Sequence, residues 1–328
     1  MSDVARAAGV ARVTVSRVIG DPDSVAPSTR QLVEEVITRL GYLPNLNAGT
    51  LASRRSRIVG AIVPTLSNAW FAETIDGLST SLADGNYQLL LGQTRYAPDG
   101  EERLVDAFLG RRVDAIVLIG TSHSPAVREK LAHAAIPVIE CWDMSPRPID
   151  TVVGFSNEAA GLCAADHLAA RGCQRLGFIG SEESRSTQRL KGFCEGIEQA
   201  GLEAPCIHRV TPPSSIADGI AALDALLAQQ PALDGIFCSN DTLAIGVLQA
   251  CRKQRLEVPG QLAVVGFSDM PIAATSVPPL TSVRVESRQI GEKAGSLLLE
   301  RLSANGSGDE PKTVIFDLGF SLVVRESA

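Results

Sequence analysis

The sequence predicts an α/β chain in which a small helical head precedes a larger core with doubly wound parallel sheets. Two short helices meet at Gly9, close to the N-terminus. From Ile58 onward, short apolar strands alternate with helical segments, which is the pattern of parallel sheets covered by helices. With 328 residues, 45% of them hydrophobic, the chain can form two or three domains with a sizeable core.

The first two helices are predicted within residues 3–19. Gly9 ends the first helix, because glycine adopts a positive φ without strain. Small or apolar residues stand where the two helices would pack: Ala5, Ala8, Val10, Val15 and Ile19. The outward face of the second helix holds Arg12, Val13, Ser16 and Arg17. Two outward arginines suit the phosphates and base edges of a DNA major groove, and the alternative is a plain helical hairpin with solvated arginines.

A third helix completes the head. After a turn at residues 21–24, Ser28 is the expected N-cap of a helix that runs to Leu40 and stops at Gly41. Three helices in so short a stretch predict a helix-turn-helix domain over residues 1–44. Residues 45–57 are then a hinge, whose weak helix would form only on a partner; an ordinary flexible linker is the alternative.

The head is basic and the rest of the chain is acidic. Residues 1–57 hold eight arginines and five acids, a net charge of +3, although the whole chain carries −7. The other residues therefore carry −10, that is, −7 minus +3. A basic head on an acidic body fits a module for binding a polyanion joined to a part that does not bind one.

The core is predicted as strand–helix units in two sets, enough for two sheets. Helices are expected over residues 70–85 and 99–110. Ligands of such folds bind beyond the carboxyl ends of the strands. Buried strands are expected over residues 58–64, 88–92, 114–119, 137–140, 175–179, 235–238 and 263–267.

The sequence does not indicate a membrane protein, a secreted protein, a metalloprotein or an enzyme. We see no membrane-spanning apolar run and no secretory signal, so the protein is expected in the cytoplasm. Seven scattered cysteines without a CxxC pair predict reduced, mostly buried thiols, with redox sensing as the alternative; neither a metal nor a cofactor is expected. An enzyme is the competing class for the α/β core, but no nucleophile elbow or phosphate loop is present, and the four histidines have no carboxylate partner by motif.

Motifs along the whole chain occur together in one known family. In the head and hinge they are Asp3-Val4-Ala5, Ala8-Gly9-Val10, Thr14-Val15-Ser16-Arg17-Val18, Gly41-Tyr42-Leu43-Pro44-Asn45 and Leu51-Ala52. In the core they are Arg189-Leu190-Lys191-Gly192-Phe193, Phe237-Cys238-Ser239-Asn240-Asp241, Gly266-Phe267 and Pro279-Leu280-Thr281-Ser282-Val283. With these motifs the chain resembles the lactose/galactose-repressor family. Within it, residues 122–125, 136–140, 153–155 and 316–320 resemble the gluconate-utilisation repressors.

The resemblance implies a homodimer whose core resembles periplasmic sugar-binding proteins, with two subdomains joined by three crossovers. We expect the crossovers near Phe155, Val283 and Lys312. The N-subdomain would comprise residues 58–154 and 284–311, and the C-subdomain residues 155–283 and 312–328, with the effector cleft between them. The chain lacks an apolar heptad tail after the last strand-like segment, residues 316–324, so a dimer is expected rather than a tetramer.

The resemblance also assigns residues to the DNA contact. It places Arg12, Val13 and Arg17 against base edges, and Arg17 would bind guanine O6 and N7 in bidentate fashion. Thr14 and Ser16 would contact phosphates. Leu51 matches the hinge leucine that the family inserts into the minor groove, where an apolar wedge bends the duplex; its alternative is packing on the core. Three further residues match the family at the DNA contact: Tyr42, Asn45 and Ala48.

For the effector, the resemblance places Trp70 and Phe71 after the first strand at positions that contact the ligand. Arg189 would reach the oxygens of the effector, Asn240 would pair with its hydroxyls, and Arg185 lies nearby. The carboxylate of Glu140 is expected to accept a hydrogen bond from a hydroxyl of the effector. An ion pair at the surface or between subdomains is the alternative for any of these side chains.

Two departures from the family favour an anionic ligand. Many sugar and purine binders have an aspartate where this chain has Ser268, and another near Cys141 where it has Trp142. Without these two acids, the site would not repel the carboxylate of a ligand. The basic residues Arg185, Arg189 and Lys191 are still present. The expected effector is gluconate or a phospho or keto derivative, and by linkage it would release operator DNA.

Some questions stay open at this point. Another sugar or a nucleobase could be the effector, and activation could replace repression. Only Met1 and Ser2 precede Asp3, which leaves the first helical turn without the usual cap, so we expect the true start upstream.

Overall fold

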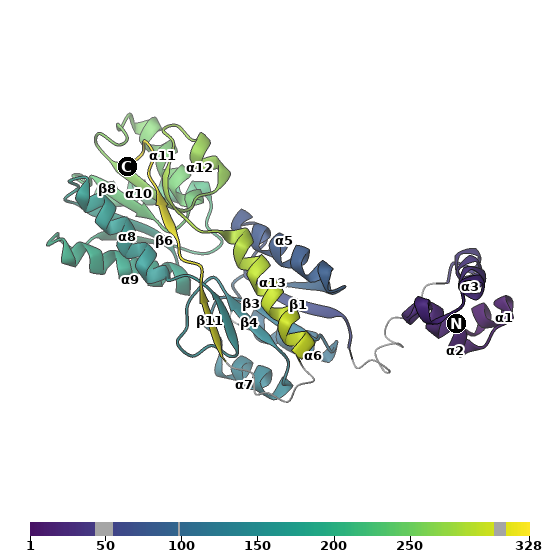
Figure 1. Ribbon diagram of the computed structural model, residues 1–328. Coiled ribbons are helices and arrows are strands. Elements are labelled where there is room, and N and C mark those ends of the chain that lie inside the picture. Colours follow the sequence, from purple (N-terminus) through teal and green to yellow (C-terminus); the bar gives the residue numbers. More distant parts are fainter. Residues whose placement is uncertain (43–54, 98, 305–312) are drawn as a thin grey trace. The chain divides into compact units, whose positions relative to one another are not determined.

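The computed structural model describes residues 1–42, 55–97, 99–304 and 313–328. They fall into two compact units, Met1–Ser56 and Arg57–Ala328 (Figure 1). The first unit is the helical head and the second is an α/β core, as the sequence predicts. Each unit is described by itself below.

The head consists of α1 (Ser2–Ala8), α2 (Arg12–Gly20), a 3-10 turn (Pro22–Ser24) and α3 (Pro27–Leu40). Gly9 and Gly41 end helices with φ of +65° and +58°, as predicted. The third helix begins two residues earlier than expected, and Ser28 is not its cap. Ala26 holds the cap position and Pro27 the first turn, where the fixed φ of proline suits a helix.

The core of the head is small and aliphatic. Of the residues predicted to pack, Ala5, Ala8 and Val15 are buried, and Val10 and Ile19 are partly buried against them. Four valines also close this core: Val4, Val18, Val33 and Val36.

The first sheet of the larger unit is entirely parallel, with strand order β11-β5-β4-β3-β1-β2. Its inner strands are continuous apolar runs, because helices cover both faces. The strands are β1 (Ile58–Val63), β2 (Gln88–Gln93), β3 (Ala115–Ile119), β4 (Val138–Cys141), β5 (Thr151–Gly154) and β11 (Val314–Asp317). The helices that follow its strands are α5 (Ala69–Asp84), α6 (Gly100–Gly110) and α7 (Pro125–Ala134).

The second sheet has the order β12-β10-β9-β8-β6-β7, parallel except for the antiparallel pair of β10 and β12. Its strands are β6 (Leu176–Ser181), β7 (Cys206–Val210), β8 (Gly235–Cys238), β9 (Ala263–Ser268), β10 (Thr281–Arg284) and β12 (Ser321–Val323). The remaining helices are α8 (Asn157–Ala170), α9 (Ser184–Gln199), α10 (Ile216–Gln229), α11 (Asp241–Gln254), α12 (Pro271–Thr275) and α13 (Ser287–Ala304).

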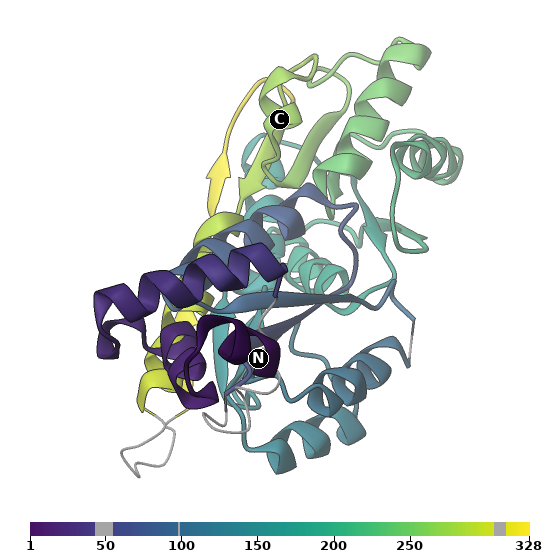
Figure 2. The ribbon, with the colours of Figure 1, turned by 90° about the vertical axis from the view of Figure 1, so that its right-hand side faces the viewer.

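The chain passes between the sheets three times. It leaves the first sheet after β5, at Phe155, and returns after β10 when α13 packs against α5 (Figure 1). The third passage corrects the expectation of a crossover near Lys312, a residue outside the described ranges. β11 pairs with β5 of the first sheet, and β12 pairs with β10 of the second. The chain therefore crosses between Asp317 and Ser321, and the C-terminal segment contributes one strand to each sheet (Figure 2).

The contact between α5 and α13 depends on glycine. A Cβ on Gly291 would lie 1.9 Å from the carbonyl oxygen of Thr74, and one on Gly77 would lie 2.3 Å from that of Arg288. The two backbones can approach so closely only because neither glycine has a side chain.

Two findings concern the described residues alone. No helix there is both long and apolar enough to pass through a membrane. Nor do three or more His, Cys, Asp or Glu side chains gather there in a way that could hold a metal ion.

Candidate functional site

A polar cleft lies where strands of both sheets end. Its walls include residues that follow β1, β2 and β4 of the first sheet, and β6, β8 and β9 of the second. The cleft encloses about 390 Å³ of space, part of it open to solvent. Tyr96 and Trp142 line it with φ of +59° and +73°, an uncommon backbone for such bulky residues and one that clusters at functional sites.

Five of the residues expected at the effector site line this cleft: Trp70, Phe71, Arg185, Arg189 and Asn240. Sequence reasoning missed others that line it with them, among them Tyr96, Glu183, Ser239 and Phe267.

Arg189 is buried at the centre of the site, on the first half of α9. Its guanidinium lies 4.1 Å from the ring centroid of Phe267, and it donates hydrogen bonds to Asn157 and, at 3.3 Å, to Glu183. Burial lowers the pKa of Arg189 to about 10, and the charge of Glu183 opposes this shift. Arg189 is therefore a cation at neutral pH. Its Nε has no hydrogen-bond partner among the described residues.

Arg185 reaches across to the first sheet from the same helix. Its guanidinium lies 5.3 Å from the ring centroid of Phe71 and donates to the carbonyl of Ile119 at 3.3 Å. Glu183 pairs with it at 3.3 Å. Both cleft arginines thus stand over aromatic rings, one on each side of the cleft.

Aromatic rings form the floor between the two sheets. Phe71 contacts Trp142 at 5.1 Å, Trp142 contacts Phe155 at 5.9 Å, and Phe155 contacts Phe267 at 5.9 Å between centroids. The indole Nε1 of Trp142 donates to Thr74 at 2.9 Å, which fixes the ring. Rings in a fixed orientation can receive the apolar face of a sugar or related ligand.

Asn240 and Ser239 present polar groups from the end of β8. Asn240 caps α11 by accepting from Leu243 N at 3.0 Å, and its Nδ2 donates to Ser214 Oγ at 3.0 Å. The hydroxyl of Ser239 is fully buried, lines the cleft, and has no partner in the part of the chain described. A hydroxyl or carboxylate group of a ligand could be the hydrogen-bond partner of Ser239.

Glu140 does not line the cleft, contrary to its expected role. It is fully buried on β4, where it accepts a hydrogen bond from Ile149 N and lies 3.2 Å from His123 Nε2. Glu101 accepts on the other side of that imidazole at 2.9 Å. His123 therefore has the carboxylate partners that no motif revealed, because they come from α6 and β4.

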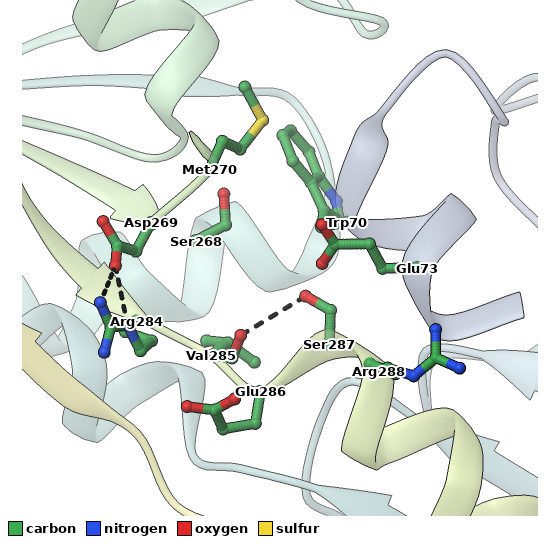
Figure 3. Close-up of a pocket in the computed structure, with 10 residues that line it drawn as sticks. All are labelled: Trp70, Glu73, Ser268, Asp269, Met270, Arg284, Val285, Glu286, Ser287 and Arg288. Carbon is green, nitrogen blue, oxygen red and sulfur yellow. Dashed lines mark hydrogen bonds and ion pairs between the residues drawn. The ribbon is translucent and has the colours of Figure 1, made fainter. Parts of the chain in front are cut away.

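Ser268 lines a neighbouring pocket of about 490 Å³, together with Trp70 (Figure 3). Its φ is +95°, and its hydroxyl donates to the carbonyl of Phe267. The next residue, Asp269, pairs with Arg284 at 2.7 Å, and the two lie on the side of the pocket away from Glu73 (Figure 3). Trp70 is the wall shared by this pocket and the cleft.

The expectation that the site has few acidic residues is wrong, because two acids lie close to the arginines. Asp143, directly after Trp142, is buried beside the cleft and accepts hydrogen bonds from Thr121 and Gln188, each at 2.8 Å. Glu183 pairs with both arginines. Lys191, which was grouped with the arginines, instead pairs with Glu158 on the exposed surface.

In the head, the predicted recognition helix is α2. Arg12, Val13, Ser16 and Arg17 are exposed, Val13 to 57%, and Thr14 is half-buried. Tyr42 packs against the small core. The other residues expected to contact DNA lie outside the described residues: Asn45, Ala48 and Leu51.

An exposed cationic helix on a three-helix head, and a two-lobed α/β core with a polar cleft, define a regulator that couples DNA binding to a small ligand. Residues 1–45 match the bacterial regulatory proteins of the lacI family, and residues 165–328 match the periplasmic binding protein-like domain. The chain is 36% identical to the HTH-type transcriptional regulator GntR of Pseudomonas aeruginosa, over 100% of this chain and 95% of that protein.

Solved structures agree with these matches. A LacI-family transcriptional regulator from Silicibacter pomeroyi has a TM-score of 0.91 at 32% identity, covering 99% of this chain and 98% of that one. The lac repressor dimer bound to operator and an anti-inducer has a TM-score of 0.86 at 23% identity, covering 99% and 97%, and supports the fold alone. The chain belongs to the lacI family: it is a DNA-binding transcriptional regulator and not an enzyme.

Proposed function

We propose that this regulator is a repressor that binds a palindromic operator as a homodimer and leaves it when a sugar acid occupies the cleft. Gluconate or a phospho or keto derivative is the proposed effector. The observation that carries this is the pair of buried arginines at the cleft, beside which Arg189 Nε and the Ser239 hydroxyl have no hydrogen-bond partner within the described ranges. Buried polar atoms of this kind favour a ligand with several oxygens.

For DNA, the proposal assigns base edges to Arg12, Val13 and Arg17, and phosphates to Thr14 and Ser16. The exposure of α2 supports this, because a helix must be free on one side to enter a major groove. A short head reads only half a site, so a second copy of the chain is needed.

Effector binding is proposed to act through the two subdomains. The arginines come from α9 of the C-subdomain, while Trp70 and Phe71 begin α5 of the N-subdomain. A ligand that contacts both would favour one relative position of the two halves. In the dimer, that change would alter the spacing of the heads and release the hinge around Leu51 from the minor groove.

The proposal is tested by sequencing the DNA that the purified protein retains from genomic fragments, with and without millimolar gluconate. A palindromic sequence that is enriched without gluconate and lost with it is the expected result. If gluconate changes neither the retained DNA nor the melting temperature, the proposed effector class is wrong. If gluconate increases retention, it is a corepressor or the protein is an activator.

A further inference from the structure

We infer that Glu183 limits the charge of the effector: the cleft takes a ligand with one negative charge, such as an unphosphorylated sugar acid, and rejects a dianionic phosphate ester. This rests on the proposed function, since it specifies which sugar acids the cleft would bind.

A carboxylate of the protein already lies between the two cleft arginines. Glu183 Oε1 lies 3.3 Å from Arg189 Nη2, and its Oε2 lies 3.3 Å from Arg185 Nη2. The same carboxylate caps α9 by accepting from Ser186 N at 2.8 Å and from Arg185 N at 3.2 Å. Its side chain is only 14% exposed, so water screens these ion pairs little.

Glu183 is ionised in this position. Burial raises the pKa of its carboxyl, but Arg185 and Arg189 oppose that effect and bring the pKa below its ordinary value. The negative charge of Glu183 is thus present at neutral pH, and it cancels one of the two arginine charges.

Asp143 cancels the other. It is buried and linked to Arg189 through Asn157, which donates to Asp143 at 3.2 Å and accepts from Arg189. Its other side-chain partners, Thr121 and Gln188, are neutral. The two arginines and two acids sum to zero. Glu183 already occupies the N-terminus of α9, so what remains for a ligand is the partial positive charge at the N-terminus of α11, whose neutral capping residue Asn240 lines the cleft.

A helix terminus carries roughly half an elementary charge, so this terminus balances at most part of one ligand charge, and the buried Asp241 in the first turn of α11 adds no positive charge. A carboxylate can also use Arg189 Nε and the Ser239 hydroxyl, which lack partners among the described residues. A second ligand charge would have no counter-charge in the buried part of the site, and an uncompensated buried charge is costly. The cleft therefore favours a monoanion.

The experiment compares wild type with Glu183→Gln in calorimetric titrations with glucitol, gluconate and 6-phosphogluconate. Glutamine keeps an oxygen that can cap α9 and removes only the charge. Wild type should bind gluconate at least about tenfold more tightly than 6-phosphogluconate. In E183Q that ratio should fall about tenfold or more, because 6-phosphogluconate, which carries the phosphate charge in addition to its carboxylate, gains most from the lost repulsion.

The matched control is Glu158→Gln. Glu158 also pairs with a residue of α9, Lys191 at 2.8 Å, but on the exposed surface away from the cleft, so E158Q should keep the wild-type ratio. Equal binding of the two acids by wild type, or an unchanged ratio in E183Q, would overturn the inference. If E183Q does not fold, Glu183→Asn removes the charge and offers another good N-cap.

Inorganic phosphate separates the two proposals. It should raise the melting temperature of E183Q but not that of wild type or E158Q. If neither sugar acid binds wild type while phosphate stabilises E183Q alone, the proposed effector is wrong and the role of Glu183 stands. If gluconate binds and releases operator but phosphate has no effect on E183Q, the proposed function stands and the charge limit is wrong.

Discussion

His123 shows how one side chain can tie three elements together. Its imidazole lies between Glu101 of α6 and Glu140 of β4, at 2.9 and 3.2 Å, and Arg128 of α7 lies 3.9 Å from Glu140. Burial lowers the pKa of His123, but the hydrogen bonds and charges of the two glutamates outweigh this and raise it to about 9. The ring is therefore charged at neutral pH and holds the loop that leads from β3 to α7.

The raised pKa predicts a pH dependence of stability. Below about pH 6.5 the folded and unfolded chains both bind the proton, and the full stabilisation, on the order of 3 kcal/mol, is present. It is lost as the pH rises toward about 9, the pKa of the folded state. The gap in melting temperature between wild type and His123→Gln should therefore shrink from pH 6 to pH 9.5.

His133→Gln is the control, because His133 is exposed at the end of α7. Its gap from wild type should stay small and nearly constant over the same range. Asp241, whose buried carboxyl has its pKa raised to about 7 by desolvation, titrates in all three proteins and cancels from the differences. A gap for H123Q that is constant with pH would contradict the charge assigned to His123.

Arg17 is the residue that we expect to discriminate between bases. If Arg17 contacts guanine in bidentate fashion, Arg17→Ala should lose about 1–3 kcal/mol of discrimination at one symmetric base pair per half-site. Operator variants at each position, titrated by fluorescence anisotropy, measure this. Arg30→Ala is the control, since Arg30 on α3 pairs with Glu34 at 2.8 Å. Equal weakening on all sequences would make Arg17 a phosphate contact only.

Some residues of the site can be identified from a short sequence motif, whereas the role of others depends on partners elsewhere in the fold. Arg189 and Asn240 could be placed because they belong to motifs on a helix and at a strand end, and Arg185 only because it lies near Arg189 in the sequence. Glu183 could not, because its role depends on two arginines that follow it on the next helix and on its use as a cap, for which Ser, Thr, Asp and Asn are the usual residues. His123 and Glu140 stand 17 positions apart in the sequence, and only the sheet brings them together.

At the scale of elements, strands with a clear apolar run were predictable, including the edge strand β2, whereas β5, β7 and β10 were not predicted. β1, β3 and β8 are continuous apolar runs, whose burial the sequence displays directly. β7 lies at the edge of its sheet and includes His208 and Arg209, so it has no apolar run. The single strand-like segment expected over residues 316–324 is two short strands in different sheets, a distinction set by pairing alone.

The pair of α5 and α13 gives a prediction for an element contact. An alanine in place of a helical glycine usually gains up to about 1 kcal/mol. At Gly291 the new Cβ would meet the Thr74 carbonyl oxygen at 1.9 Å, so the helices must move apart. Gly291→Ala should lose about 1–3 kcal/mol, measured by urea unfolding. Gly110→Ala, at the end of α6, should be neutral or slightly stabilising, because outside its own helix no described residue lies within 4 Å of the added Cβ.

At the scale of the whole molecule, two proposed sites lie in different units of one chain. The head is basic and small, while the cleft is built from both sheets of the acidic core. Linkage requires that any effect of one ligand on the other be mutual. If gluconate weakens operator binding by some factor, saturating operator must weaken gluconate binding by the same factor.

Coupling of this kind is proposed to pass through the hinge. Leu51→Ala should weaken operator binding strongly, because the wedge in the minor groove is lost, and leave gluconate affinity of the free protein unchanged. Calorimetric titration of gluconate, with and without the operator duplex, measures both effects. In wild type the affinity should fall in the presence of operator and not with a scrambled duplex. In L51A, at duplex concentrations that saturate wild type but not the variant, that fall should disappear. Unchanged operator affinity in L51A would exclude the wedge role, and a gluconate affinity indifferent to operator in wild type would exclude coupling.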